Sequence, residues 1–158
     1  MSRELILVWA GRHQRDSWSS LVADYLERIR RWTPIREIVV KVRDERDAAT
    51  RLRTEAAALL GALPEPVYLV ALDRRGEAVS SPELADRLTR VRDEWPHAVA
   101  FLLGSDLGLA PELLARARWK WSLGPLTLPH ELARLVVAEQ VYRALSIGAG
   151  IKYHRAPL

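Results

Sequence analysis

Short apolar runs that alternate with helix-like patterns constrain the fold of this 158-residue chain more than any other feature of its sequence. Five runs rich in Leu, Ile, Val, Ala or Trp have the length of strands, namely residues 4–10, 35–42, 67–72, 98–103 and 119–123. Segments with helical spacing or helix-favouring composition follow them, at residues 18–32, 46–63, 80–95, 111–117 and 129–147. Strands that alternate with helices predict an α/β fold, in which a mostly parallel sheet carries helices on both faces.

The predicted sheet indicates where a ligand would bind. Residues 98–103 are apolar on both faces, which predicts a central strand. In open parallel sheets, ligands lie at the carboxyl ends of the strands, so the loops after Leu72, Leu103 and Leu123 are the candidate site. The first of these, residues 73–80, is predicted to be a polar loop that turns at Gly76. We expect a single domain spanning residues 1–158, because this length with 49% apolar residues suits one core.

The composition argues against several classes of protein. Cysteine is absent, so neither a disulfide framework nor a cysteine-based zinc site is possible. The four histidines have no paired metal-ligand spacing, and no metal site is expected. No stretch approaches the roughly 20 apolar residues that cross a bilayer, and no signal-peptide pattern is present, so we expect a cytoplasmic protein with no membrane anchor. The net charge of +4 modestly favours phosphate-rich partners.

Two loops at the predicted carboxyl edge could bind a ligand. Gly104 and Gly108 follow a buried strand and allow close approach of the backbone, but they match neither the Walker nor the Rossmann fingerprint, and a tight turn is the simpler account of them alone. Residues 121–130 carry no formal charge and hold two prolines and a glycine, so they are not a simple strand. Their backbone polar groups either meet neighbouring backbone or bind a ligand such as an adenine edge.

The last predicted helix is apolar around most of its circumference, with Leu132, Leu135, Val136, Val137, Val141, Ala144 and Leu145. A core contact on one side and a dimer interface on the other would account for this. Glu139 and Arg143 are spaced for a helical ion pair, which could be a plain surface contact. After the helix, Lys152 to Arg155 combine an aromatic ring, a histidine and two cations, although terminal residues are usually solvated.

Basic and aromatic residues are interleaved at residues 28–32 and again at residues 116–121. Such mixtures suit RNA, because cations meet phosphates and rings stack on exposed bases. A solvated helix face beside core tryptophans explains each cluster at least as well.

Several segments taken together resemble one known family. They are Leu72-Asp73 with Gly76 and Ser81, Phe101 to Gly104 with Gly108-Leu109, residues 121–130, Arg134, residues 139–144 and residues 153–155. Their order and spacing resemble the RlmH family along the whole chain. This family comprises ribosomal RNA large-subunit pseudouridine N3-methyltransferases of the SPOUT superfamily. The resemblance implies a C-terminal trefoil knot, a homodimer and S-adenosyl-L-methionine (SAM) as methyl donor. It implies that SAM contacts Leu72, Gly104, Gly108, Leu123, Gly124, Pro125, Leu126, Thr127 and Leu128.

Two features depart from the family pattern. Ser105 and Asp106 stand where the family usually has a second glycine followed by proline or alanine. The Asp106 carboxylate is expected either to attract the sulfonium cation of SAM or to point to water. The chain also continues through Ala156 to Leu158, past the usual Tyr-His-Arg ending.

The implied reaction transfers a methyl group to N3 of a pseudouridine in large-subunit (23S) ribosomal RNA within the assembled ribosome. This in-line displacement requires alignment but no metal. Since the imide N3 carries a proton, we expect His154 to accept it and Arg143 to stabilise the anion. Glu139 would orient Arg143, and Tyr153 would position the base by stacking. Dimerisation would pool two basic faces and could let the tail of one subunit complete the site of the other.

Two other functions remain open from the residues alone. A non-enzymatic RNA- or ribosome-binding protein could keep this fold and lose SAM, which Ser105 and Asp106 would favour. A nucleotide-binding α/β domain with other chemistry is the second, but the missing Walker and Rossmann fingerprints argue against it.

Overall fold

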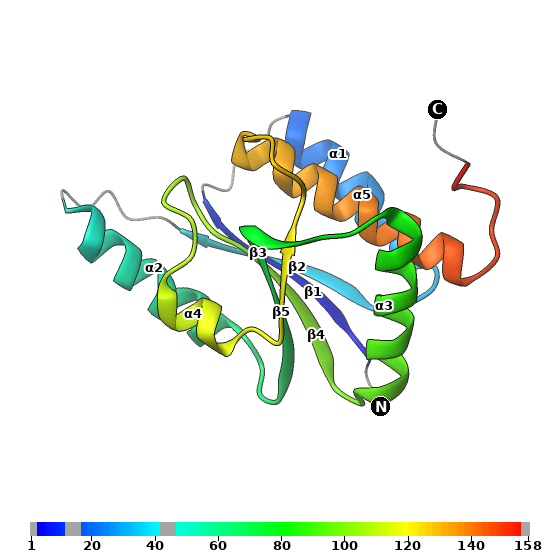
Figure 1. The fold of residues 1–158 in the computed structure, drawn as a ribbon, viewed down its shortest axis with the longest axis horizontal. Helices are drawn as coiled ribbons and strands as arrows, with labels where there is room; N and C mark the ends of the chain where they lie inside the picture. Colours follow the sequence, from blue (N-terminus) through cyan, green and yellow to red (C-terminus); the bar gives the residue numbers. More distant parts are fainter. Residues whose placement is uncertain (1–2, 12–16, 42–46, 156–158) are drawn as a thin grey trace.

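The computed structural model describes residues 3–11, 17–41 and 47–155, in which strands and helices alternate (Figure 1). The strands are β1 (Leu5–Gly11), β2 (Ile35–Lys41), β3 (Val67–Ala78), β4 (Ala98–Leu103) and β5 (Trp119–Ser122). The helices are α1 (Ser17–Ile29), α2 (Ala48–Ala62), α3 (Ser81–Glu94), α4 (Pro111–Arg116) and α5 (His130–Gly148). The predicted ends at Val42 and Arg46, and the tail from Ala156 to Leu158, lie outside the described residues. Every predicted element is present.

The five strands form one sheet in the order β2-β1-β4-β3-β5, and every neighbouring pair is parallel. β4 lies in the middle, as its two apolar faces predict, and its first five residues are buried. The predicted α/β fold is therefore confirmed. Because the strands are parallel, the ends of β3 and β4 open onto the same edge of the sheet, which places the loops after Leu72 and Leu103 together.

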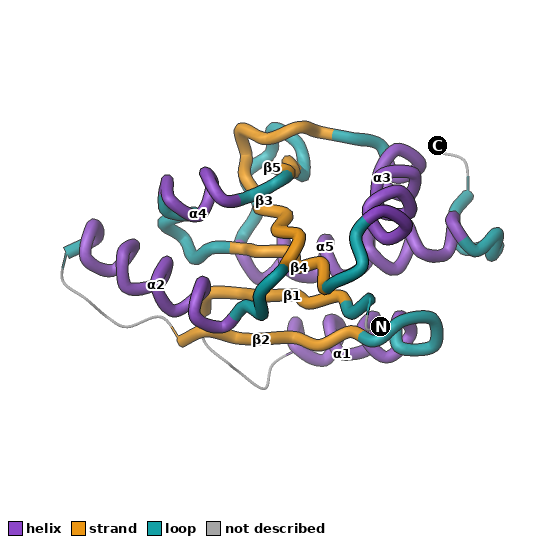
Figure 2. The backbone as a smooth tube through the Cα atoms, turned by 90° about the horizontal axis from the view of Figure 1, so that it is seen from below, coloured by secondary structure: helices purple, strands orange, loops and turns teal. Residues whose placement is uncertain are grey.

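Helices cover both faces of the sheet, and each face has its own core (Figures 1 and 2). α1, α3 and α5 pack on one face, around a core that includes Phe101 and Val141. α2 and α4 pack on the other face, around Leu59, Leu102 and Leu113. Within the described residues, no helix is long and apolar enough to span a membrane.

The prediction of a polar loop at residues 73–80 is wrong. β3 continues to Ala78 and pairs with β5 a second time through Glu77 and Ala78, after an irregularity in its register. Gly76 permits the close approach, because a Cβ atom there would lie 2.5 Å from the Lys120 carbonyl oxygen. The extension lies beyond the residues of β3 that pair with β4, so it pairs on one side only. Polar side chains are therefore tolerated in it.

A capping box forms the start of α3. Ser80 accepts a hydrogen bond from the backbone N–H of Glu83, and the Glu83 carboxylate accepts one from the Ser80 N–H. These hydrogen bonds lower the pKa of Glu83 below its usual value. The capping box fixes where α3 begins, and Ser81 then reaches across to α5, where its hydroxyl lies 2.6 Å from Gln140.

Candidate active site

A cleft of about 430 Å³ lies at the carboxyl edge of the sheet. Residues 72–74 of β3, the loop after β4, residues 121–130 and Ala133 at the start of α5 contribute to its lining. Of the predicted cofactor residues, Leu72, Gly108, Leu123, Gly124, Leu126, Thr127 and Leu128 line this cleft. Gly104 and Pro125 lie in the same two loops but do not line it.

The segment from Leu123 to Pro129 leaves backbone groups available to a ligand. It has no regular secondary structure, and Gly124 adopts a positive φ of 116° at its start. The Ser122 hydroxyl holds the turn, because it accepts a 3.1 Å hydrogen bond from the Gly124 N–H. Within the described chain, the N–H groups of residues 126–128 donate to no other backbone group. An apolar wall with unpaired backbone donors and acceptors suits a heteroaromatic ring such as adenine.

Gly104 is required by the shape of its own loop. A Cβ atom at this position would lie 2.2 Å from the Gly108 carbonyl oxygen and 3.1 Å from Leu109. Gly108 itself adopts a φ of 75°, and its N–H donates to the Ser105 carbonyl oxygen. The two glycines thus form a tight turn, and Gly108 lines the cleft. Gly104 therefore shapes the cleft indirectly, because its lack of a side chain lets this turn fold back beside the cleft.

Ser105 and Asp106 are anchored to α2 on the other face of the sheet. The Ser105 hydroxyl donates a 2.7 Å hydrogen bond to Glu55, a carboxylate that is only 3% exposed. Asp106 forms an ion pair with Arg51, whose Nε also lies 3.4 Å from Glu55. The Asp106 side chain is 70% exposed, so it points to water, as one of its two expected roles requires, while Arg51 pairs with its carboxylate. The unusual pair of residues therefore secures the loop.

Replacing Arg51 with Ala should lower the free energy of unfolding by about 2 kcal/mol, because the buried Glu55 carboxylate would lose its cation. The measurement is urea unfolding followed by circular dichroism. Arg53→Ala is the matched control on the same helix. Arg53 is exposed and donates a hydrogen bond to the Thr50 hydroxyl, so this variant should stay within about 0.5 kcal/mol of wild type. Equal midpoints for the two variants would remove the anchoring role of Arg51.

The four predicted catalytic residues lie together on the second half of α5 and the tail. Arg143 donates from Nε and Nη2 to one oxygen of Glu139, at 3.0 and 2.7 Å. The Tyr153 hydroxyl donates to the same oxygen at 3.1 Å. His154 approaches from the tail, with Nδ1 3.2 Å from Nη1 of Arg143. The ion pair between Glu139 and Arg143 is therefore part of a larger network that orders the tail.

Hydrogen bonds in the network determine which atoms of Tyr153 and His154 donate and which accept. Burial has the largest effect on the pKa of Tyr153, and a hydrogen bond with Tyr25 and the nearby Glu139 charge act in the same direction. Together they raise this pKa well above its usual value, so the Tyr153 hydroxyl stays a donor. Arg143 can only donate, so in this contact His154 accepts through Nδ1 and carries its proton on Nε2. His154 can accept a second proton only at Nδ1, once the contact with Arg143 is released.

The catalytic network and the cleft are separated within one chain. Ala133 lines the cleft and Arg143 belongs to the network, ten residues further along α5. An α-helix rises about 1.5 Å per residue, so the two are about 15 Å apart. Figure 1 shows the start of α5 beside the carboxyl edge of the sheet and the tail at its far end. One protomer therefore does not bring its tail to its own cleft.

The sequence did not predict the side-chain contacts that anchor the cleft loop and the start of α5 to the rest of the fold. Arg51 and Glu55 are spaced i, i+4 on α2, which signals a helical ion pair but not a partner in a distant loop. Arg134 is among the residues that resemble the family, but its contacts were not predicted. Its buried guanidinium donates twice to Glu37 of β2 and lies 5.9 Å from the Trp9 ring centroid. This pair docks the start of α5 onto the sheet. Within the described residues, no group of acidic or histidine side chains could hold a metal ion.

Comparisons with solved structures and with a family model define the fold and the class of protein. A probable methyltransferase from Bordetella pertussis Tohama I superposes with a TM-score of 0.55 and 17% identity, over 91% of this chain and 96% of that one. The SpoU methyltransferase AviRb from Streptomyces viridochromogenes, solved with the cofactor AdoMet, gives 0.50 and 11%, over 94% and 60%. The family described as "Predicted SPOUT methyltransferase" matches residues 3–154. The parallel sheet with its cleft is thus the fold of a SPOUT methyltransferase.

Sequence relatives define the family more narrowly. A ribosomal RNA large subunit methyltransferase H from Stenotrophomonas maltophilia strain K279a is 46% identical over 137 residues, covering 85% of this chain and 87% of the relative. The protein of the same name from Rubrobacter xylanophilus is 43% identical over 159 residues, covering 98% and 99%. The chain belongs to the ribosomal RNA large subunit methyltransferase H family. It is an rRNA methyltransferase that uses SAM, and the non-enzymatic alternative is set aside.

Proposed function

We propose that this enzyme methylates N3 of a pseudouridine in large-subunit ribosomal RNA, and that its substrate is the assembled ribosome. The observation that carries the proposal is the network of Glu139, Arg143, Tyr153 and His154. Methylation of an imide nitrogen requires that its proton be removed and the resulting anion be stabilised. The network supplies a fixed cation and a titratable ring for these two tasks.

The cleft is the proposed SAM site, where the cofactor would supply an activated methyl group. Leu72, Gly108 and the segment from Leu123 to Leu128, with Pro125 shaping that segment, would hold its adenosine portion, and Gly104 would keep the turn in place. The apolar lining and the unpaired N–H groups of residues 126–128 support this assignment. We further propose the trefoil knot expected from the family, in which α5 is drawn past the loops that form the cleft.

Each chain residue has a proposed role in the reaction. Arg143 faces the carbonyl oxygen next to N3 and stabilises negative charge that develops there. Glu139 holds the guanidinium in place through two hydrogen bonds to one of its oxygens. His154 accepts the N3 proton at Nδ1 after the contact with Arg143 is released. Tyr153 stacks beside the base and keeps the tail folded over Glu139.

The active enzyme is proposed to be a homodimer in which each cleft is completed by the tail of the partner. A half-buried stripe, Leu132, Val136, Glu139 and Arg143, runs along one face of α5 from the cleft to the network. In the proposed dimer, the two-fold axis that relates the protomers crosses the middle of this stripe, so the two α5 helices pack antiparallel. The network of one protomer then lies beside the cleft of the other, which closes the gap of about 15 Å.

Exposed apolar side chains around α5 support the same interface. Trp18 and Leu21 of α1, which packs beside α5, are 36% and 48% exposed, and Ile151 in the tail is 42% exposed. An obligate dimer of this kind buries more than about 2,000 Å² in total. We propose that the chain acts as a single domain over residues 1–158 and works in the cytoplasm, where assembled ribosomes are its substrate.

The test is mass spectrometry of ribosomal RNA from a strain that lacks this gene. One methyl group on a large-subunit pseudouridine should be absent and should return when the wild-type gene is supplied. Purified enzyme with SAM should restore it on ribosomes from that strain and much less on protein-free RNA. A missing methyl group at another atom or on another nucleotide would contradict the proposed N3 specificity.

A further inference from the structure

A second pocket lies away from the cleft, near the end of the sheet where the strands begin. Its volume is about 390 Å³, and it lies between the end of α3, the start of β3 and Arg118 just before β5. Tyr68 lines the pocket and Leu72 lines the cleft, four residues apart on β3, so the two sites are about 13 Å apart along the strand. Pockets that bind small molecules span roughly 300–1,000 Å³. The proposed function gives this pocket no role.

Aromatic rings form one wall of the pocket. Tyr68 and Trp95 meet edge to face, with ring centroids 6.1 Å apart. The Trp95 indole is fixed by a 3.0 Å hydrogen bond to the Ala98 carbonyl oxygen. The Arg118 guanidinium lies 4.5 Å from the Trp95 centroid and 5.7 Å from that of Tyr68. The wall is therefore a platform of two rings that meet edge to face, with the Arg118 guanidinium beside both of them.

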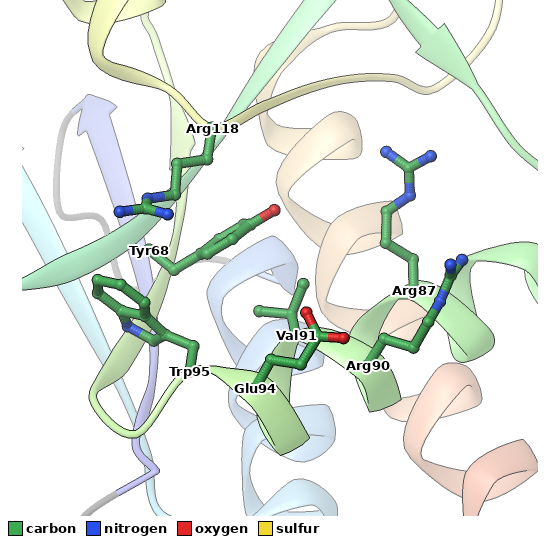
Figure 3. Close-up of a pocket in the computed structure, with 7 residues that line it drawn as sticks. All are labelled: Tyr68, Arg87, Arg90, Val91, Glu94, Trp95 and Arg118. Atoms are coloured by element: carbon green, nitrogen blue, oxygen red, sulfur yellow. The ribbon is translucent and has the colours of Figure 1, made fainter.

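Two further arginines face this platform. Figure 3 shows Arg87 and Arg90 on α3 across from Arg118, with the Tyr68 hydroxyl directed into the space between them. Arg87 is neutralised by Glu77 at 2.9 Å and lies over the Trp119 ring. Arg90 and Arg118 are exposed, and neither forms an ion pair within the described part of the chain. Two arginine charges therefore remain available beside the aromatic wall.

We propose that this pocket binds one nucleotide of the RNA substrate at a distance from the reacting base. Arg90 and Arg118 bind the phosphate, because guanidinium forks match phosphate oxygens. The base packs against Tyr68 and the guanidinium plane of Arg118, which are surfaces on which unstacked RNA bases lie. The proposal rests on the proposed function for the identity of the RNA.

Glu94 is the acidic residue of the pocket and favours a nucleotide over a bare phosphate chain. A carboxylate repels phosphate but accepts hydrogen bonds from a ribose 2′-hydroxyl or a base N–H. The structure also revises the predicted basic-aromatic cluster at residues 116–121. Its tryptophans, Trp119 and Trp121, are buried and stack on each other, so only Arg118 of that cluster serves this pocket.

The test is binding of a fluorescein-labelled single-stranded RNA of about twelve uridines, a length within the range that proteins cover on single strands. Fluorescence anisotropy gives Kd at several salt concentrations for wild type, Arg90→Ala and Arg118→Ala. Each variant should bind about 10-fold more weakly at low salt, and the slope of log K against log salt should fall by about 0.7 per lost phosphate contact. Arg53→Ala, which removes an exposed arginine from the opposite face of the sheet, should change both quantities little.

Calorimetry of SAM binding shows whether each variant is folded, since neither arginine lines the cleft. Wild-type affinity and slope in both pocket variants, with SAM binding intact, would overturn the proposal. So would a loss of ribosome binding with unchanged RNA binding, because the pocket would then meet a ribosomal protein. Failure of the N3 assignment would show only in the mass spectrometry of ribosomal RNA, so the two proposals can fail separately.

Discussion

A heterodimer of one Gly104→Val subunit and one His154→Ala subunit should retain about half of wild-type methyl transfer, because one of its two sites is intact. Each homodimer should be nearly inactive. Valine at position 104 collides with the Gly108 carbonyl and disrupts the turn beside the cleft, so that subunit should bind SAM poorly. Its tail is unchanged, however, and can complete the cleft of the His154→Ala partner. Co-expression with two different affinity tags isolates the heterodimer for the assay.

The arrangement in which each tail serves its own cleft predicts the opposite result. One subunit would then lack its cleft and the other its histidine, and the heterodimer would be as inactive as the two homodimers. Sedimentation must give roughly twice 17.9 kDa for wild type and for both variants, which shows that the substitutions leave the dimer intact. A well-folded wild-type monomer at micromolar concentration would contradict the shared site directly.

The layout of the fold could be predicted because the signals that fix it are local. β4 is apolar on both faces, and only a central strand of a covered sheet buries both. The exception is β3, whose polar second half is a strand because of Gly76 and the neighbouring β5. That pairing joins residues more than 40 positions apart, and nothing in residues 73–80 alone indicates it. The proposed knot, too, would depend on the path of the whole chain.

The candidate site also has features that could be predicted from the sequence and features that could not. The carboxyl-edge rule leads from the strands to the residues that line the cleft, and helical spacing leads to the pair Glu139 and Arg143. The attachment of the cleft loop to Arg51 and Glu55 could not be predicted, because a charged pair on a helix normally indicates a solvated face. The separation of the tail from the cleft needs only the length of α5, which the sequence already contains.

His154→Ala should reduce turnover by roughly 10²-fold or more if this side chain handles the N3 proton, the usual scale for general acid–base catalysis. SAM affinity should stay near wild type, since His154 is outside the cleft and a tail residue contributes little to the core. Arg143→Ala should also lose activity, but partly through stability, because Glu139 would lose the partner of two of its hydrogen bonds. Methyl incorporation into ribosomes from a strain without its own enzyme measures both variants.

His154→Gln separates the two ways in which the histidine could act. The glutamine amide can still accept a hydrogen bond from Arg143, as Nδ1 of the neutral ring does in the observed contact, but it cannot accept a proton at neutral pH. If His154 is the proton acceptor, Gln should be as inactive as Ala. Substantial recovery with Gln would show that the side chain acts as a hydrogen-bond partner of Arg143 rather than as a base. Undiminished turnover with both variants would remove His154 from the mechanism. Water would then have to take the N3 proton, and Arg143 would have to stabilise the anion that remains.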